Sequence, residues 1–338
     1  MADLNLPEGA SAFLNANGWG GAEIAPLAGD ASFRRYFRVR DGARRAVLMD
    51  APPPNENCAA FVAIDTYLAA RGISVPQVFA SAPEQGLALL EDLGDSMFVR
   101  AIEAGVDEAA LYRAATDVLA HLHAEPMAES VGVHPVGPYA EERMAREVAL
   151  VLDWHWPELM GGAADDALRA AYAAAWAEVW PLARAHDDRL VQLDYHSPNL
   201  MWLPEREGLA RVGVLDFQDA MRGPAAYDLV SLIQDPRRDV PAALESELVA
   251  RYLAARPEFD PGAFAASYAV LGAQRAARIL GVFVRLWRRD GKPGYLRHIP
   301  RVWSLLDRNL AHPALAPVAG WFDANLPLSA RRDFTGAA

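Results

Sequence analysis

The sequence predicts an α+β protein with two lobes, a small β-rich N-terminal lobe and a large helical C-terminal lobe. A chain of 338 residues exceeds the size at which a single hydrophobic core usually suffices, which favours two units. Strand-like runs dominate roughly the first ninety residues, whereas the apolar residues beyond 91–94 recur with a helical period. We therefore expect an N-terminal lobe over residues 1–93 and a C-terminal lobe over residues 94–338.

The N-terminal lobe combines short strands with one helix. Apolar and β-branched runs predict strands over residues 33–40, 46–49, 75–80 and 87–90. Asp41 and Gly42 separate the first two runs, which indicates a tight hairpin turn. Asn57 can cap a helix that runs to about residue 70, and Gly72 is a suitable C-terminal stop for it.

The C-terminal lobe is predicted to be mainly helical. Its apolar periodicity indicates helices over residues 107–123, 140–153, 165–187, 226–234, 241–255, 262–289 and 298–311. Three apolar runs interrupt this pattern and predict short strands over residues 190–193, 200–203 and 212–215. Polar residues stand at the ends of these strands and in the tight loops between them, where catalytic groups tend to lie.

Three of these polar residues have the chemistry and the order needed for phosphoryl transfer. Asp194 is followed by Asn199 after four intervening residues, and Asp216 comes at the end of a later strand. Asp194 can accept the proton of an acceptor hydroxyl, while Asn199 and Asp216 offer hard oxygen ligands that suit Mg²⁺ beside nucleotide phosphates. Asp and Asn are also ordinary turn formers, so each one alone carries little information. Their order and spacing between apolar strands favour a catalytic site.

The overall composition argues against several classes of function. The net charge is −12 and no row of Lys or Arg forms a stripe suited to nucleic acid, so we expect no nucleic-acid partner. Cys58 is the only cysteine, which excludes an intrachain disulfide and a cysteine-rich zinc site. No apolar run reaches the ~20 residues needed to span a bilayer, and the first residues lack the pattern of a signal peptide. We therefore expect a cytoplasmic protein without membrane association.

Four segments match patterns of one known enzyme family. They are Asp194-x4-Asn199, Asp216-Phe217, Leu-Leu-Glu-Asp-Leu-Gly over residues 89–94, and Leu-Ala-His-Leu-His over residues 119–123. In these segments the chain resembles the aminoglycoside phosphotransferases, which have a bilobal protein-kinase-like fold. The resemblance implies that ATP and Mg²⁺ are used, that Asp194 is catalytic, and that Asn199 and Asp216 bind the metal ion.

The same resemblance assigns roles to the lobes and to the segment that joins them. It implies that the N-terminal lobe binds the nucleotide and that the C-terminal lobe carries the catalytic and substrate-binding groups. It also implies that the backbone of a hinge holds adenine, with contacts from Glu91, Asp92 and Leu93.

Four further strings narrow the resemblance. They read Gly-Asp-Ala-Ser-Phe-Arg-Arg-Tyr-Phe-Arg, Val-Leu-Met-Asp-Ala-Pro-Pro, Val-Leu-Asp-Phe-Gln-Asp-Ala and Arg-Asp-Gly-Lys-Pro-Gly-Tyr, over residues 29–38, 47–53, 214–220 and 289–295. In these strings the chain is similar to the cell-wall-recycling anomeric sugar kinases, which act on N-acetylmuramate and N-acetylglucosamine. The resemblance implies phosphorylation of the C1 hydroxyl to a sugar 1-phosphate for peptidoglycan recycling. We expect a sugar-1-phosphate uridylyltransferase to take up that product.

The nucleotide-binding segments depart from the family pattern in two ways. The strand that normally carries a phosphate-binding lysine ends in Met49 and holds no lysine. Arg34 or Arg35 could supply the missing cation, since guanidinium groups suit phosphate, although both could instead be solvated on an edge strand. The loop that should cradle the phosphates is poor in glycine, so Ser32, Phe33 and backbone N–H groups would have to serve there.

Several residues near the catalytic triple could face the acceptor. His196 and Asp219 are predicted to contact the acceptor hydroxyls, although a packed loop histidine and a turn-capping aspartate are the alternatives. Asp228 is better explained as a structural support of the catalytic loop. Three arginines on the helix over residues 262–289 could bind a substrate carboxylate or pair with acidic residues of the protein, namely Arg275, Arg278 and Arg285.

Three functions are therefore compatible with the sequence. The leading prediction is a Mg-ATP-dependent kinase acting at the anomeric carbon of N-acetylmuramate and N-acetylglucosamine. An aminoglycoside- or choline-type phosphotransferase is the second, because a cationic substrate would suit the acidic balance of the chain. A nucleotide-binding pseudokinase is the third, because the lysine is missing.

Overall fold

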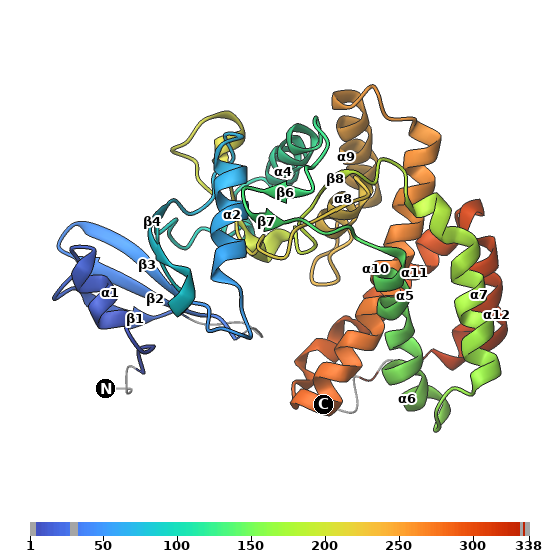
Figure 1. Ribbon diagram of the computed structural model, residues 1–338. Coiled ribbons are helices and arrows are strands. Elements are labelled where there is room, and N and C mark those ends of the chain that lie inside the picture. Colours follow the sequence, from blue (N-terminus) through green and yellow to red (C-terminus); the bar gives the residue numbers. More distant parts are fainter. Residues whose placement is uncertain (1–4, 28–32, 332–333, 335–338) are drawn as a thin grey trace. The chain divides into compact units, whose positions relative to one another are not determined.

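The computed structural model describes residues 5–27, 33–331 and 334, and these fold into two compact units (Figure 1). The first unit comprises Met1–Val118, Ala128–Val136 and Ser197–Ala220, and the second comprises Leu119–Met127, Gly137–His196 and Met221–Ala338. A small antiparallel sheet lies in the first unit and most of the long helices lie in the second, so the predicted α+β class is confirmed. The units do not follow a single boundary at residue 93, and the functional division into lobes over 1–93 and 94–338 stays a prediction.

The sheet of the first unit has five antiparallel strands in the order β1-β2-β3-β5-β4. The strands are β1 (Glu23–Pro26), β2 (Arg35–Asp41), β3 (Arg44–Asp50), β4 (Val78–Ala82) and β5 (Leu87–Leu90). The β2–β3 hairpin turns at Gly42, whose φ of 59° only glycine adopts readily, as the Asp-Gly pair predicts. Strand β4 begins two residues beyond Pro76, which has no N–H to donate to a strand partner.

A hydrophobic core forms on one face of this sheet. The short helix α1 (Ala10–Ala16), which the sequence did not predict, contributes Phe13 and Leu14 to it. These side chains pack with Phe37 and Leu48 from the middle of the sheet. Burial of such large apolar side chains stabilises the sheet by about 1.5–3 kcal/mol each.

Helix α2 (Cys58–Ala69) confirms the predicted helix and its ends. Asn57 caps it, since its side-chain Oδ1 accepts a hydrogen bond from the Ala60 N–H at 2.9 Å. Gly72, with a φ of 74°, follows its C-terminus. The ring of Phe61 stacks on Phe217 with centroids 5.0 Å apart, so the helix supports the segment that contains Asp216.

The remaining elements of the first unit are short. Strands β9 (Leu200–Trp202) and β10 (Val212–Val214) confirm two of the predicted short strands, and they form an antiparallel pair. Helix α3 (Phe98–Glu103) lies close to β9 and to the 3₁₀ turn Ser197–Asn199, while α4 (Glu108–Leu122) belongs to both units. A two-residue pair, β6 (Ser130–Val131) and β7 (His134–Pro135), completes the unit.

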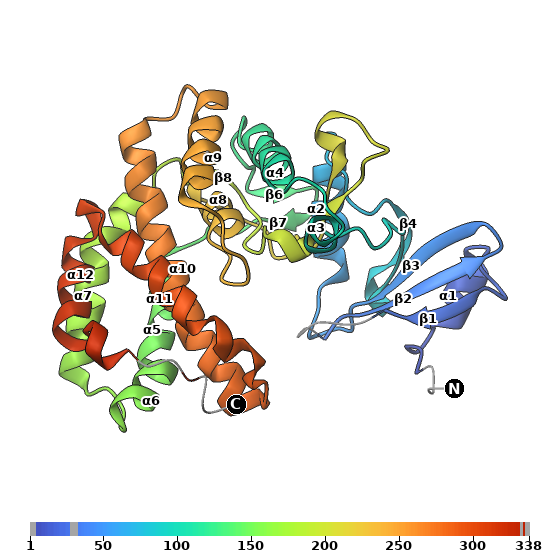
Figure 2. The same ribbon diagram turned by 180° about the vertical axis from the view of Figure 1, so that it is seen from behind.

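The second unit is built around the long helix α10 (Pro261–Asp290), which lies beside α5 and α11 in both views (Figure 1 and Figure 2). The other α-helices are α5 (Glu141–Leu150), α6 (Trp156–Met160), α7 (Asp166–Ala183), α8 (Ala226–Ile233), α9 (Ala242–Ala255), α11 (Ile299–Leu310) and α12 (Ala316–Asn325). Strands β8 (Arg189–Val191) and β11 (Met221–Gly223) pair antiparallel. Within the described residues, no helix has the length and apolar character needed to cross a bilayer.

The helix expected over residues 140–153 changes character at its C-terminal end. It is α-helical only to Leu150, and Val151–His155 forms a π-helical turn. A side chain at Gly281 of α10 would collide with the backbone of Leu150, so the glycine permits the two helices to approach closely there. The π turn coincides with this close approach, which a sequence pattern does not reveal.

Candidate active site

The loop that carries Asp194 is held by a buried carboxylate. Strand β8 ends at Val191, and the next two residues, Gln192 and Leu193, donate their backbone N–H groups to Asp228 at 2.6 and 3.0 Å. Asp228 is fully buried on α8, which confirms its predicted role as a support. Leu193 has a φ of 71°, a conformation that costs about 1–2 kcal/mol and persists because the Asp228 contacts hold it.

Asp194 lies among basic groups of the second unit. Burial raises the pKa of Asp194, but the guanidinium groups of Arg275 and Arg278 outweigh it and hold the pKa below its ordinary value. The carboxylate is therefore ionised at neutral pH and can accept a proton. Burial lowers the pKa of His196 more than the nearby Asp235 raises it, so this imidazole is neutral. We call Asp194, His196, Arg275 and Arg278 the Asp194 cluster.

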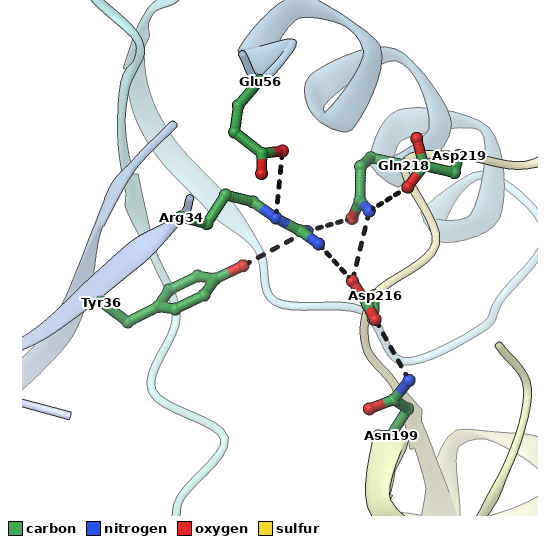
Figure 3. A network of polar contacts seen from close by, with 7 residues as sticks. All are labelled: Arg34, Tyr36, Glu56, Asn199, Asp216, Gln218 and Asp219. Atoms are coloured by element: carbon green, nitrogen blue, oxygen red, sulfur yellow. Dashed lines mark hydrogen bonds and ion pairs between the residues drawn. The ribbon is translucent and has the colours of Figure 1, made fainter. Parts of the chain in front are cut away.

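Asn199 and Asp216 lie together in the first unit (Figure 3). Asn199 ends the 3₁₀ turn that precedes β9, and Asp216 follows β10 with a φ of 60°. The Leu215 N–H donates to the Asn199 carbonyl at 2.9 Å, and Asn199 Nδ2 donates to Asp216 Oδ2 at 3.3 Å. The predicted pair of oxygen-bearing side chains is thus side by side at the ends of two paired strands.

Arg34 contacts the aspartate of this pair (Figure 3). Its Nη2 donates to Asp216 Oδ1 at 2.5 Å, its Nη1 donates to Gln218 Oε1, and its Nε lies 3.4 Å from Glu56 Oε2. The side chain is only 9% exposed. Arg35, in contrast, pairs with Asp50 across the β2–β3 hairpin, with its Nε 2.8 Å from Oδ2. The structure therefore separates two arginines that the sequence left as alternatives.

Arg34 brings a positive charge to the face of the sheet on which Met49 stands in place of a lysine. Met49 is fully buried and pairs with Tyr36 across the hairpin, so the two side chains share one face of the sheet. Arg34 lies two residues before Tyr36, and its Nη1 is 3.5 Å from the Tyr36 hydroxyl. The cation thus reaches this face from the chain that enters β2, while β3 contributes an apolar side chain.

Gln218 links the acidic groups of the site, and sequence reasoning did not single it out. Its Nε2 donates to Asp216 Oδ1 at 3.2 Å and to Asp219 Oδ2 at 3.0 Å, and its Oε1 accepts from Arg34 (Figure 3). Asp219 itself is exposed. The only signal in the sequence was the position of this glutamine between two aspartates. We call Arg34, Asn199, Asp216 and Gln218 the Asp216 cluster.

The predicted hinge is held by arginines of the first unit. Arg38 Nε lies 2.8 Å from Asp92 Oδ2, and Arg206 Nη2 donates to Glu91 Oε1 at 2.6 Å. The Glu91 N–H donates to the Gln77 carbonyl at 2.8 Å. These contacts order residues 91–93, and the binding of adenine by Glu91, Asp92 and Leu93 stays a prediction. In the phosphate loop, Ser32 lies outside the described residues and Phe33 is exposed.

Comparison with known proteins identifies the family. The sequence profile described as the phosphotransferase enzyme family matches residues 23–266, which is more than half of the chain. The chain belongs to this family. It is therefore an enzyme of the kinase type, and the catalytic loop and the Asp216 segment both fall inside the matched region.

Relatives of similar length support the same assignment. This phosphotransferase is 42% identical to the N-acetylmuramate/N-acetylglucosamine kinase of Caulobacter vibrioides, over 95% of this chain and 97% of the relative. It is 36% identical to the protein of that name from Pseudomonas aeruginosa, over 97% and 95% of the two chains.

Solved structures confirm the protein-kinase-like fold. A choline/ethanolamine kinase family protein from Mesorhizobium loti is similar with a TM-score of 0.61 at 16% identity, over 93% of this chain and 95% of the other. A choline kinase from Streptococcus pneumoniae is similar with a TM-score of 0.57 at 13% identity, over 85% and 93% of the two chains. At such low identity the similarity concerns the fold alone.

The residues of the Asp216 cluster fit a magnesium ion that is shared with a nucleotide. Among the described residues, no group of three or more His, Cys, Asp or Glu side chains could hold a metal ion by itself. Asn199 and Asp216 contribute an amide and a carboxylate, which are hard oxygen donors. Mg²⁺ typically takes one or two such side chains and completes its shell with phosphates and water. The donor set therefore suits a substrate-borne ion better than a permanent one.

Proposed function

We propose that this phosphotransferase transfers a phosphoryl group from ATP to the C1 hydroxyl of N-acetylmuramate and N-acetylglucosamine. The observation that carries the proposal is the 42% identity, over nearly the whole chain, to a relative named for these two sugars. The pairing of Asn199 with Asp216 and the ionised state of Asp194 support a working catalytic site. Position C1 is the more specific part of the proposal, and it rests on the strings over residues 29–38, 47–53, 214–220 and 289–295.

Each group of the site has a defined task in this reaction. Asp194 orients the C1 hydroxyl and accepts its proton, while the sugar oxygen forms a bond to the γ-phosphorus and the bond to the ADP oxygen breaks. Asn199 and Asp216 would hold Mg²⁺, which neutralises charge on the phosphates when it is bound. The anomeric hydroxyl is more acidic than other sugar hydroxyls, so a single carboxylate is a sufficient proton acceptor.

The remaining predicted residues complete the proposal. Arg34 is the favoured phosphate-binding cation, since it is the arginine that contacts Asp216, and Ser32, Phe33 and Arg35 stay proposed neighbours of the nucleotide. We also propose that His196 and Asp219 contact the sugar. The sugar 1-phosphate would pass to a sugar-1-phosphate uridylyltransferase in a cytoplasmic recycling route.

A cationic substrate is less well supported. Arg275 and Arg278 act on Asp194 electrostatically, so the group that accepts the proton lies in a positively charged environment. An aminoglycoside or choline would have to bring its own positive charge close to these arginines, which is unfavourable. The pseudokinase alternative loses its main argument because Arg34 supplies a cation where the lysine is missing.

Acceptor specificity tests the proposal directly. The protein is incubated with ATP, Mg²⁺ and one acceptor at a time, and products are identified by phosphorus NMR. We expect N-acetylmuramate and N-acetylglucosamine to give sugar 1-phosphates, whereas their methyl glycosides, kanamycin and choline give none. Phosphorylation of a methyl glycoside as fast as the free sugar would contradict the C1 assignment. Transfer to choline or kanamycin alone would contradict the sugar assignment.

A further inference from the structure

Two arginines of α10 lie close to Asp194 in the second unit. Arg275 and Arg278 are three residues apart, so their side chains project from neighbouring positions on one side of the helix. Both act on the charge of the Asp194 carboxylate. Arg278 also lies 3.8 Å from Glu147 Oε1, so the two guanidinium groups belong to one charged region around Asp194.

Arg275 is a buried cation that acts electrostatically on the carboxylates of Asp194 and Asp235. Its side chain is only 4% exposed, and its Nε has no hydrogen-bond partner among the described residues. The neighbouring carboxylate of Asp228 is already engaged by the N–H groups of Gln192 and Leu193. A buried N–H group without an acceptor is costly, because it has lost its hydration and gained no hydrogen bond in return.

Arg278 shares the carboxylate of Glu147 with several other donors. Its Nε lies 3.8 Å from Glu147 Oε1, which is beyond hydrogen-bond range. Glu147 accepts much closer donors instead, from Tyr139 at 2.7 Å, Gln274 at 2.8 Å and Arg143 at 2.9 Å. The carboxylate that balances Arg278 is thus largely committed elsewhere.

The same side of α10 carries further positive charge toward its C-terminus. Arg285 follows Arg278 by two helical turns. Burial lowers the pKa of Arg285, and the like charges of Arg289 and Arg278 lower it further. In a chain with a net charge of −12, this row of cations on one helix is a local feature rather than a general property of the surface. An anion bound here would relieve the repulsion.

The two proposed sugar substrates differ by an anionic group. N-acetylmuramate is N-acetylglucosamine with a lactyl ether on the oxygen at C3, and that ether ends in a carboxylate. We propose that Arg275 and Arg278 form a carboxylate subsite that binds the lactyl group of N-acetylmuramate and sets the preference of the enzyme for this sugar. A planar guanidinium can bind a carboxylate through two parallel hydrogen bonds. This inference rests on the proposed function and adds the residues that distinguish its two substrates.

The test compares N-acetylmuramate with its neutral methyl ester. The kcat/KM ratio of acid to ester is measured for the parent, Arg278→Gln, Arg275→Gln and the control Arg288→Gln. Arg288 is an exposed arginine of the same helix whose Nε donates to Glu158 at 2.7 Å. Because each ratio compares two substrates on one protein, a general loss of activity or of folded protein cancels.

We expect the parent to favour the acid by about ten- to a hundredfold, the range for hydrogen bonds to charged groups. The preference should fall to within a few fold in Arg278→Gln and Arg275→Gln and persist in Arg288→Gln. A parent that treats acid and ester alike would overturn the subsite, and so would an unchanged ratio in both cluster variants.

A binding measurement keeps the subsite and the proposed function apart. Titration calorimetry of the parent and Arg278→Gln with the acid and the ester requires no turnover. If the acid binds more tightly to the parent alone but is never phosphorylated at C1, the proposed function is wrong and the subsite stands. If both sugars become 1-phosphates without any preference that depends on the arginines, the proposed function stands and the subsite is wrong.

Discussion

The Asp216 cluster and the Asp194 cluster use arginine in different ways. In the Asp216 cluster the carboxylate accepts a direct hydrogen bond from Arg34 at 2.5 Å, so the acidic group is tied to a cation of the same site. In the Asp194 cluster, Arg275 and Arg278 act on the carboxylate through their charge. Under the proposed function, the first arrangement would exchange partners when phosphates and a metal ion bind. In the Asp194 cluster, the charges of Arg275 and Arg278 favour the ionised form of Asp194.

This difference means that damage to each cluster should have its own signature. Changes in the Asp216 cluster should alter the dependence on Mg²⁺ and nucleotide, because those ligands replace its internal contacts. Changes in the Asp194 cluster should alter turnover and sugar selectivity, because its contacts set the state of the proton acceptor.

The largest effect is expected at Asp216. Asp216→Ala should reduce turnover by about 10³–10⁵-fold, the scale on which an essential charge acts in phosphoryl transfer. Added Mg²⁺ should not restore activity, whereas Asn199→Ala should mainly raise the Mg²⁺ concentration needed for half-maximal rate, since Asn199 brings no charge. Turnover is followed across a Mg²⁺ titration. An Asp216→Ala enzyme with the Mg²⁺ dependence of the parent would remove the metal role from this residue.

Asp194→Asn should have the next largest effect and a different signature. The amide keeps the shape of the side chain but cannot accept a proton, so kcat should fall by about 10²–10⁴-fold. The affinity for nucleotide, measured by calorimetry, should change little, and the Mg²⁺ dependence should match the parent. Turnover within a few fold of the parent would show that another group accepts the proton.

Arg34 and Arg35 provide a matched pair for the Asp216 cluster. Arg34→Ala should weaken ATP binding by about ten- to a hundredfold, the loss expected for hydrogen bonds to a charged group, and should leave adenosine binding almost unchanged. Arg35→Ala should spare ATP affinity because Arg35 pairs with Asp50. Equal losses of ATP and adenosine affinity in Arg34→Ala would indicate a structural role, and a specific ATP defect in Arg35→Ala would exchange the two assignments.

The smallest effect concerns stability and comes from Asp65. Interactions with arginine that lower the pKa, of the kind seen at Asp194, are not among the causes of the shift at this carboxylate. Asp65 is buried on α2, and its Oδ2 has no hydrogen-bond partner among the described residues. Burial, with a smaller contribution from the charge of Glu91, raises the pKa of Asp65 to about 7. Between pH 4 and 7 the folded protein therefore retains a proton that the unfolded chain has released.

The free energy of unfolding of the parent should consequently fall as the pH rises through this window, and that of Asp65→Asn should fall less. Relative to the parent, the variant should gain roughly 2 kcal/mol of unfolding free energy between pH 4.5 and pH 8, after allowance for partial solvation. Urea denaturation at the two pH values measures this difference. Parallel pH dependence in parent and variant would mean that Asp65 is ionised in the folded protein, as Asp194 is.

The sequence by itself determined much of the local structure. The Asp41-Gly42 pair predicted the β2–β3 hairpin, and Asn57 predicted the start of α2, because turn and cap geometry depend on a few adjacent residues. The spacing of Asp194, Asn199 and Asp216 predicted a catalytic site from residue order alone; the structure pairs Asn199 with Asp216, and the catalytic roles stay predictions. The π turn at Val151–His155 was missed because it accompanies a contact with a distant helix.

Tertiary structure alone decided which charged groups work together. Arg34 and Arg35 are adjacent and chemically identical, yet one contacts Asp216 and the other Asp50, because successive residues of an extended chain point to opposite faces. Arg275 and Arg278 could have paired with any acidic residue, and only the packing of α10 places them beside Asp194. Electrostatic partners depend on distance in space and on burial, which residue order does not specify.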